Sequence, residues 1–198
     1  VALHPEDGVE AGELLRAADT AVYAAKAGGR NTCRFYAREL ETVVRERASI
    51  EQGLRHALVT GQLRLCYQPR IDAATRRVCG AEALLRWTSP DLGEVSPRRF
   101  VAVAEQSELI SEIGAWVLDQ ACRDASPWIR DTPGFVLAVN LSARQLRAPD
   151  FADAVQRCLA RHDVAAQRLE LEITESALLA VCQQARNTLG ALAALGVS

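Results

Sequence analysis

Strand-like and helix-like segments alternate from residue 62 to the end of the chain, and this alternation restricts the possible folds more than any other feature. The strand-like segments are short and apolar, whereas the helix-like segments carry apolar residues at three- and four-residue spacing. The expected segments are, in chain order, hairpin strands at 63–71 and 78–87, a helix around 110–121, a strand at 135–141, a helix at 150–162, a strand at 168–173 and a helix at 177–195. Such alternation predicts a parallel sheet with helices packed outside it.

The length of this alternating region bears on whether its sheet closes. A closed barrel of strand–helix units typically requires about 250 residues, and its functional residues gather at the C-terminal ends of the strands. Residues 62–198 are too few for such a barrel. We therefore predict an α/β fold that is either a TIM-like (β/α) barrel truncated to its first half or an open α/β sheet.

The first part of the chain has a different pattern. Residues 1–36 indicate a helix and then a short strand at 33–36, and they are too few to bury a core of their own, so we interpret them as the end of a preceding domain. Residues 37–61 are helical in pattern and highly charged. They are either a linker helix that passes a signal or mediates dimer contacts, or an ordinary amphipathic helix packed on the domain at 62–198.

Composition excludes some classes of protein. Lys and Arg total 23 against 25 Asp and Glu, and this balance argues against a nucleic-acid-coating surface. No apolar run approaches the ~20 residues of a membrane span. The chain contains no Met, which suggests a piece of a longer protein that could carry an upstream membrane or sensor domain. Its six cysteines form no Cys-x-x-Cys pair and no His lies at zinc-finger spacing, so we expect small core residues in a reducing cytoplasm.

Three polar residues interrupt the apolar strand-like runs. Glu82, Asn140 and Glu172 each lie in or at the end of a different run, and a helix-like segment follows each one. A polar group buried there without a partner would cost stability. Three oxygen-bearing groups from three strands suggest one shared partner, and a hard divalent cation fits best. Oxygen ligands suit both Mg²⁺ and Mn²⁺, so the choice between them stays open.

Neighbouring polar residues have a functional and a structural interpretation. Arg86 lies four residues beyond Glu82, on the same face of a strand, and its guanidinium could fork onto a phosphate beside a cation or pair with a surface carboxylate. Gln68 could simply satisfy the hydrogen bonds of a strand edge. Glu172 and Asn140, taken singly, could be a hydrogen-bonded structural acid and a loop cap. Glu170 is expected to face outward, between helices or solvent.

Several of these residues lie in segments that together resemble one family. The pentapeptide at 82–86, Glu-Ala-Leu-Leu-Arg, resembles the motif that names the EAL domain family, phosphodiesterases of the bacterial second messenger cyclic di-GMP. The matching segments are Tyr67-Gln68-Pro69 before it, Phe100 to Glu105 after it, Val139-Asn140-Leu141-Ser142, and Glu172-Ile173-Thr174-Glu175-Ser176, in the expected order and spacing. The resemblance covers about residues 40 to 198.

The EAL resemblance implies a barrel with Mg²⁺ or Mn²⁺ at its mouth and hydrolysis of cyclic di-GMP to linear pGpG. It implies that Glu82, Asn140 and Glu172 are metal ligands and that Glu175 holds an active-site loop in place. It also implies that Gln68 and Arg86 contact the dinucleotide. The family's remaining acids and its lysine would lie beyond Ser198, so we expect this chain alone not to hydrolyse cyclic di-GMP.

The first 36 residues resemble a second family. Residues 18–26 and 29–31 look like the C-terminal end of a GGDEF domain, a family that makes cyclic di-GMP from GTP. The resemblance implies that Lys26 and Arg30 contact a nucleotide triphosphate. Their spacing suits a shared phosphate, although a basic helix end favoured by the helix dipole explains them equally well.

Three functions therefore remain open for a protein of this kind. The first is a metal-dependent phosphodiesterase in a tandem GGDEF–EAL protein, which we expect to be a homodimer. The second is an inactive cyclic di-GMP receptor or interaction module. The third is a regulatory partner of an active diguanylate cyclase domain. The intact Glu82, Asn140, Glu172 and Arg86 favour the enzyme.

Overall fold

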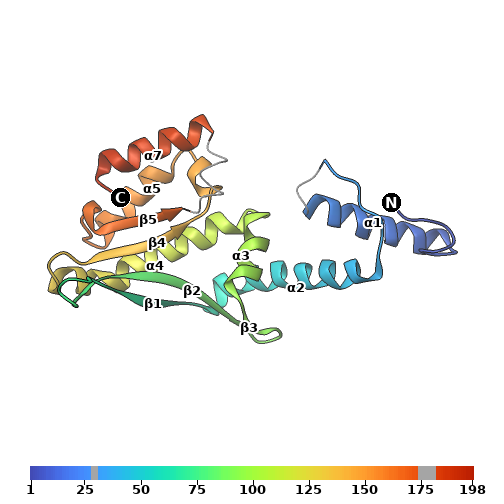
Figure 1. Cartoon of the computed structure of the whole chain (residues 1–198), viewed down its shortest axis with the longest axis horizontal. Helices are drawn as coiled ribbons and strands as arrows, with labels where there is room; N and C mark the ends of the chain where they lie inside the picture. The colour runs from blue at the N-terminus through green and yellow to red at the C-terminus, as the bar shows by residue number, and fades with distance from the viewer. Residues whose placement is uncertain (28–30, 174–181) are drawn as a thin grey trace. The chain divides into compact units, whose positions relative to one another are not determined.

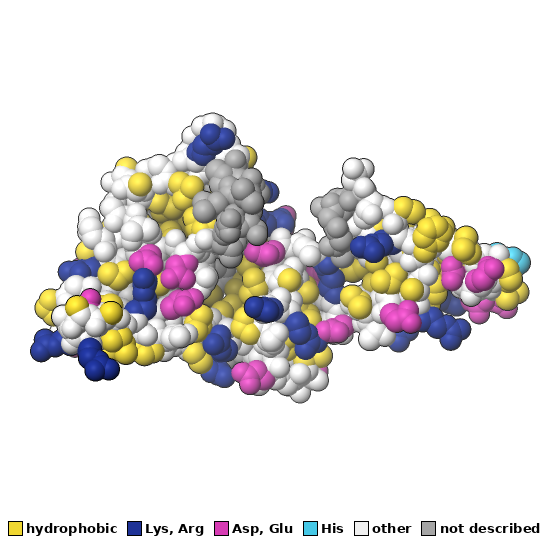
Figure 2. Space-filling view, in the orientation of Figure 1, with side chains coloured by type: hydrophobic (Ala, Val, Ile, Leu, Met, Phe, Trp, Pro, Cys, Tyr) yellow, Lys and Arg dark blue, Asp and Glu magenta, His cyan; other side chains and the backbone are white. Residues whose placement is uncertain are grey.

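The computed structural model describes residues 1–27, 31–173 and 182–198 (Figure 1). The chain divides into two compact units, Val1–His56 and Ala57–Ser198. Over the face in Figure 2, Lys and Arg side chains lie interspersed with Asp and Glu side chains, as the near-balanced charge predicts. Within the described part of the chain, no helix combines the length and the apolar character that a membrane crossing requires.

The first unit contains helix α1 (Ala11–Ala27) and most of helix α2 (Arg38–Thr60). The guanidinium of Arg47 on α2 lies 5.3 Å from the ring centroid of Tyr23 on α1, within cation–π range. The strand predicted at 33–36 does not form. Among the described residues this segment pairs with Val1: Tyr36 N–H donates to Val1 O at 2.8 Å, and the Val1 amino group donates to Arg34 O at 2.7 Å. Two hydrogen bonds to a single residue are too few for a strand ladder.

The second unit is built on one mixed sheet. Its strands are β1 (Leu63–Ile71), β2 (Val78–Ser89), β3 (Gly93–Val95), β4 (Val136–Leu141) and β5 (Leu169–Ile173). The strand order is β1-β2-β4-β5, with β3 paired to β2. β1 and β2 are antiparallel, as predicted for the opening hairpin, whereas β2–β4 and β4–β5 are parallel. The short strand β3 is not among the strands expected from the sequence.

The first two helices of this unit contact strands of the sheet, the third packs on the second, and the fourth packs on the third (Figure 1). They are α3 (Pro97–Glu105), α4 (Leu109–Asp131), α5 (Phe151–Arg161) and α7 (Gln183–Leu195), with short 3₁₀ turns at Gln145–Arg147 and Ala166–Arg168. Helix α3 starts with Pro97 after an extended Ser96, and proline is favourable at this first helical position. Helix α4 continues through Pro127, well beyond its predicted apolar stripe. The predicted start of the last helix, at 177, lies outside the described residues.

Helix α4 covers one face of the β1–β2 hairpin. The Tyr67 hydroxyl on β1 donates to Asp124 on α4 at 2.8 Å, and the Tyr67 ring meets Trp128 edge-on at a centroid distance of 4.8 Å. Because side chains alternate along a strand, Gln68 lies on the opposite face of β1 from Tyr67. The sheet therefore has one face packed on α4 and a second face that carries Gln68.

The core is centred on aromatic residues between β2 and α3. Trp87 is fully buried and meets the fully buried Phe100 edge-on at a centroid distance of 5.8 Å. The Trp87 indole N–H donates to Gln62 Oε1 at 3.3 Å, so its polar atom is satisfied. Strand β4 is buried along most of its length, and Asn140 near its end is its one exposed residue.

The cysteines are only partly the core residues that the sequence predicts. Cys122 and Cys158 are buried and Cys66 is half-buried. Cys33, Cys79 and Cys182 are exposed, so the prediction of core positions is wrong for these three. All six are free thiols.

Truncating Trp87 is expected to be among the most costly changes in the second unit. Trp87→Ala should lower the free energy of unfolding by about 3–5 kcal/mol, because it leaves a large cavity beside Phe100. The measurement is urea unfolding followed by circular dichroism. Ile71→Ala is the control, since Ile71 is 61% exposed and its truncation should change stability by less than about 0.5 kcal/mol. A Trp87→Ala protein as stable as the Ile71→Ala protein would contradict this view of the core.

Candidate functional site

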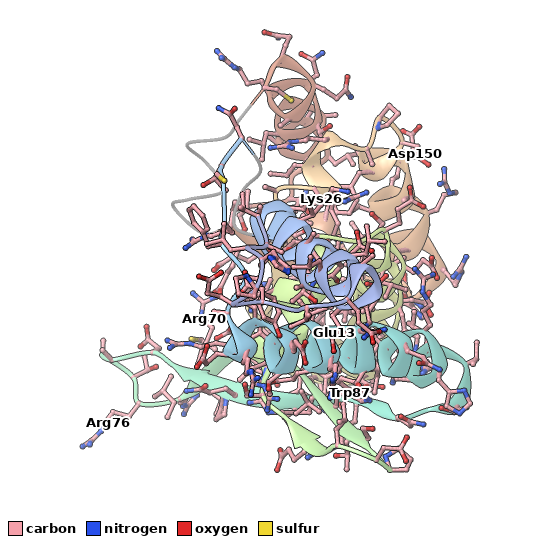
Figure 3. All side chains as sticks on the ribbon, turned by 90° about the vertical axis from the view of Figure 1, so that its right-hand side faces the viewer. Glu13, Lys26, Arg70, Arg76, Trp87 and Asp150 are labelled. Atoms are coloured by element: carbon pink, nitrogen blue, oxygen red, sulfur yellow. The ribbon has the colours of Figure 1, made fainter. Side chains whose placement is uncertain are left out.

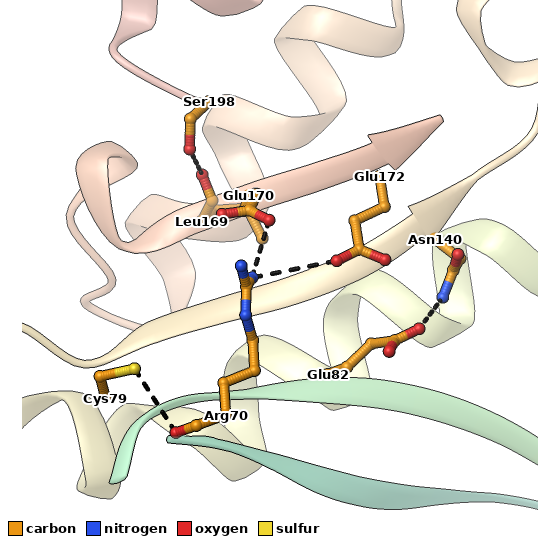
Figure 4. A network of polar contacts seen from close by, with 8 residues as sticks. All are labelled: Arg70, Cys79, Glu82, Asn140, Leu169, Glu170, Glu172 and Ser198. Atoms are coloured by element: carbon orange, nitrogen blue, oxygen red, sulfur yellow. Dashed lines mark hydrogen bonds and ion pairs between the residues drawn. The ribbon is translucent and has the colours of Figure 1, made fainter. Parts of the chain in front are cut away.

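Glu82, Asn140 and Glu172 lie on three adjacent strands. Strand pairing sets Glu82 on β2 opposite Ala138 on β4, and Asn140 on β4 opposite Glu172 on β5. Asn140 lies two residues beyond Ala138, so the alternation of side chains brings all three residues to one face of the sheet. The Asn140 side-chain amide donates to Glu82 Oε1 at 2.7 Å (Figure 4). The structure thus brings together the three residues that the sequence singled out.

Strand register also explains why the three residues share one edge of the sheet. Asn140 and Glu172 are each the residue before the last of a parallel strand. Glu82 is in the middle of the long strand β2, but β4 pairs with β2 only from Gly80 to Ala83. Glu82 therefore lies at the C-terminal end of the parallel part of β2. All three residues occupy the edge at which parallel α/β folds bind their ligands.

The site concentrates negative charge. The pKa of Glu172 is raised above its ordinary value, first by burial of its carboxyl group and then by the nearby Glu82 carboxylate. Glu170 raises it further and the positive charge of Arg70 lowers it. A divalent cation between the carboxylates would remove the repulsion that raises this pKa.

Arg70 on β1 joins the same face. Its Nη1 lies 2.7 Å from Glu170 Oε1 and 3.9 Å from Glu172 Oε1 (Figure 4). The hydrogen bond to Glu170 raises the pKa of Arg70, which keeps the guanidinium charged. The expectation that Glu170 faces outward is wrong, because Glu170 and Glu172 are two residues apart on one strand and lie on one face. Sequence analysis missed Arg70, although its period-two spacing from Gln68 was a usable signal.

The two predicted dinucleotide contacts lie beside this group. Gln68 is exposed and stands directly opposite Glu82 in the β1–β2 ladder. Arg86 is half-buried, and its Nη1 donates to its neighbour's carbonyl, Leu85 O, at 2.9 Å. Arg86 and Asn140 both line a cavity of about 320 Å³ that also touches α3 and α4. A guanidinium in such a cavity is free to turn toward an anionic ligand.

Three other predicted residues fall outside this geometry. Glu175 and Arg30 lie outside the described residues. Lys26 is an exposed side chain in the last turn of α1, in the first unit (Figure 3).

The chemistry of the donor set fits a hard divalent cation. Glu82 and Glu172 offer carboxylate oxygens, and Asn140 offers an amide oxygen. The Asn140 nitrogen faces Glu82, so binding through the amide oxygen requires a half-turn of that amide group. Such all-oxygen sets suit Mg²⁺ or Mn²⁺ rather than metals that prefer sulfur. Gln68 and Arg86 would add a donor and a positive charge for a phosphate.

Comparison with known proteins agrees with this geometry. The chain is 43% identical over 197 residues to an uncharacterized signaling protein of Caulobacter vibrioides. The match covers 100% of this chain and 24% of that protein. It is 39% identical over 198 residues to MucR of Pseudomonas aeruginosa, a bifunctional diguanylate cyclase/cyclic di-GMP phosphodiesterase, with 100% of this chain and 29% of that protein covered. The chain thus spans less than a third of the length of these curated relatives.

A solved structure and a family model complete the comparison. The structure of the MucR phosphodiesterase in complex with cyclic di-GMP superposes with a TM-score of 0.70 and 39% identity, over 76% of this chain and 61% of that one. The model of the EAL domain matches residues 51–198, a range that contains every strand of the sheet. The chain therefore belongs to the EAL domain family.

Proposed function

We propose that the second unit is part of a phosphodiesterase domain that hydrolyses cyclic di-GMP to linear pGpG. The observation that carries the proposal is the convergence of Glu82, Asn140 and Glu172 on one face and one edge of three adjacent strands. The solved structure of the MucR phosphodiesterase, which is similar to this one, contains bound cyclic di-GMP. Cleavage of one of the two phosphodiester bonds of the ring by water would give the linear product.

The proposed metal ligands are Glu82, Asn140 and Glu172, and the cation is Mg²⁺ or Mn²⁺. When bound, such a cation supplies Lewis-acid polarisation of a phosphodiester and acidifies a water molecule. Arg70 would hold Glu170 and balance part of the negative charge next to Glu172. Glu175 would support a loop of the active site, as the family resemblance implies.

Arg86 and Gln68 are the proposed contacts to the dinucleotide. Arg86 lines the cavity next to Asn140, so a phosphate bound beside the cation would lie within reach of the guanidinium. Gln68 stands opposite Glu82 on the exposed face of β1, where its amide can hydrogen-bond a ligand held by the same face. Together the two residues would fix the orientation of the phosphodiester.

The sheet is proposed to be a part of a TIM-like barrel. Its parallel strands, the helices between them and the position of the polar residues at the strand ends support this assignment. We further propose that residues 1–36 are the end of a GGDEF domain, with Lys26 and Arg30 near its nucleotide. The similarity to a bifunctional cyclase/phosphodiesterase over 100% of this chain supports that arrangement.

Removal of the Glu82 carboxylate tests the proposal. In the full-length protein, Glu82→Gln should lower the turnover of cyclic di-GMP by at least about a hundredfold, because a lost metal ligand forfeits several kcal/mol of transition-state stabilisation. The readout is pGpG separated by chromatography. Glu94→Gln is the matched control, since Glu94 is an exposed carboxylate on β3 that lies 3.8 Å from Arg64. Turnover by Glu82→Gln within about threefold of the control would contradict the proposal.

Neutralisation of Arg86 tests the proposed phosphate contact. Arg86→Gln should raise the apparent KM for cyclic di-GMP by about tenfold or more, because a hydrogen bond to a charged group is worth ~1.5–3 kcal/mol. Arg76→Gln is the control, because Arg76 lies at the tip of the β1–β2 hairpin, away from the sheet (Figure 3). Equal KM values for the two variants would remove Arg86 from the substrate site.

A further inference from the structure

A second group of metal-ligating side chains lies where helices α4 and α5 meet. It consists of Asp119 from α4, Cys158 from α5 and His162 at the C-terminal end of α5. One ligand atom from each residue lies within 4.8 Å of the other two. Among the residues that the structure describes, this is the one such group of His, Cys, Asp or Glu side chains. None of its members belongs to the site built on Glu82.

Two contacts hold the group together. His162 Nε2 lies 2.9 Å from Asp119 Oδ1, and the His162 backbone N–H donates to Cys158 O at 3.2 Å. Cys158 and His162 are four residues apart, which places two ligands on neighbouring positions of one helical face. Asp119 reaches them from the facing helix, since α4 and α5 pack against each other. One helix therefore supplies two ligands at four-residue spacing, and tertiary packing brings the third from α4.

The surroundings of Asp119 and Cys158 favour the deprotonated forms of these two side chains. Hydrogen bonds from His162 and Arg161 lower the pKa of Asp119, so its carboxyl group is ionised at neutral pH. A hydrogen bond from Cys122, the residue one turn beyond Asp119 on α4, lowers the pKa of Cys158, while the same hydrogen bond and burial raise the pKa of Cys122. Of the two thiols, Cys158 is the one whose sulfur lies within 4.8 Å of the ligand atoms of Asp119 and His162.

The dimensions suit a tetrahedral ion after small movements. With Zn–N and Zn–O lengths of about 2.0–2.2 Å and Zn–S of about 2.3 Å, the ligand atoms of a tetrahedral site stand roughly 3.3–3.6 Å apart. The present group, with a spread of at most 4.8 Å and one separation of 2.9 Å, requires side-chain shifts on the order of 1 Å. The His162 side chain is 12% exposed and the Asp119 side chain is 35% exposed, so Asp119 is the more accessible of these two ligands.

The group also has access from outside. A cavity of about 360 Å³ is lined by Asp119 and Cys158, together with Arg157 and Arg161. Arg161 Nη1 currently lies 2.7 Å from Asp119 Oδ1, but its side chain is 66% exposed and can turn into solvent. A cation can therefore reach the ligands, and a water molecule or a further ligand can complete its coordination from the cavity.

We propose that Asp119, Cys158 and His162 form a binding site for a zinc-like divalent cation, with the fourth coordination position open to the adjoining cavity. The mixed sulfur, nitrogen and oxygen donors select a metal of this borderline-soft class over Mg²⁺ and Mn²⁺. Three protein ligands and one open position are the arrangement typical of exchangeable or reactive zinc sites. The proposal is independent of the phosphodiesterase function.

Cobalt substitution tests the proposed site. The full-length protein, stripped of metal and kept reduced, is titrated with Co²⁺ in excess Mg²⁺, which occupies any all-oxygen site. We expect one equivalent of Co²⁺ to give a thiolate-to-metal charge-transfer band that Zn²⁺ abolishes. Cys158→Ser should remove the band, and His162→Gln should weaken Co²⁺ binding by at least about tenfold. Cys182→Ser should leave the band unchanged, since Cys182 is an exposed thiol whose pKa is also lowered.

Three results would overturn the proposal. They are the absence of a charge-transfer band in the unaltered protein, a band that persists in Cys158→Ser, and a band that is lost equally in Cys182→Ser. Asp119→Asn provides a further check, because this partly exposed side chain can be changed without disturbing the buried thiols, and Co²⁺ affinity unchanged in this variant would exclude Asp119 as a ligand. Circular dichroism of each variant confirms that the fold is retained.

Discussion

The parallel pairing of β4 with both β2 and β5 is the constraint on which the candidate site depends. This pairing sets Asn140 beside Glu172 and brings its amide group to 2.7 Å from Glu82. A slip of one residue in either ladder would turn the side chains of one strand to the other face and separate the group. Gly80 helps to fix the register, because a Cβ at this position would collide with the carbonyl oxygen of Val136 on β4. A close backbone approach therefore supports the geometry of a polar site.

The clustered carboxyl groups of the site also lower the stability of the fold, because burial and mutual repulsion disfavour the charged form of Glu172. Glu172 is partly buried beside Glu82 and Glu170, and the raised pKa of Glu172 records that cost. Arg70 offsets part of it from the neighbouring hairpin, on the face of β1 that α4 does not cover. Aromatic packing lies elsewhere in the unit, where Trp87 meets Phe100 and Tyr67 meets Trp128. These aromatic contacts hold the strands that carry the charged groups, and a bound cation would relieve the remaining repulsion.

The sequence pattern predicted the elements that have a clear local periodicity. It did not predict the features that depend on contacts between distant segments. The hairpin, the parallel strands and Glu82, Asn140 and Glu172 followed from apolar runs and their polar interruptions. The strand β3 was missed because three residues paired to β2 carry little pattern of their own. The role of Arg70 depends on which strand lies across the sheet from β1, which the sequence of one strand does not show. The roles proposed for the three polar residues, and the domain assignment of residues 1–36, stay predictions.

The group at Asp119, Cys158 and His162 illustrates the same limit. A search for zinc-finger spacing fails because the ligands come from two helices that meet only in the folded chain. Both candidate metal sites of this protein are thus made by packing between elements, and they differ in donor chemistry. One offers only oxygen, and the other offers sulfur, nitrogen and oxygen, so the two sites should select different cations.

Binding of Mn²⁺ measures the central claim most directly, because it reports on the ligands without requiring turnover. Free Mn²⁺ gives an electron paramagnetic resonance signal that is lost on binding, so a titration of the full-length protein yields an affinity. The account predicts saturable binding in the unaltered protein, a loss of at least about tenfold in Glu172→Gln, and no change in Glu94→Gln. Equal Mn²⁺ affinity in all three proteins would contradict the assignment of Glu82, Asn140 and Glu172 as one metal site.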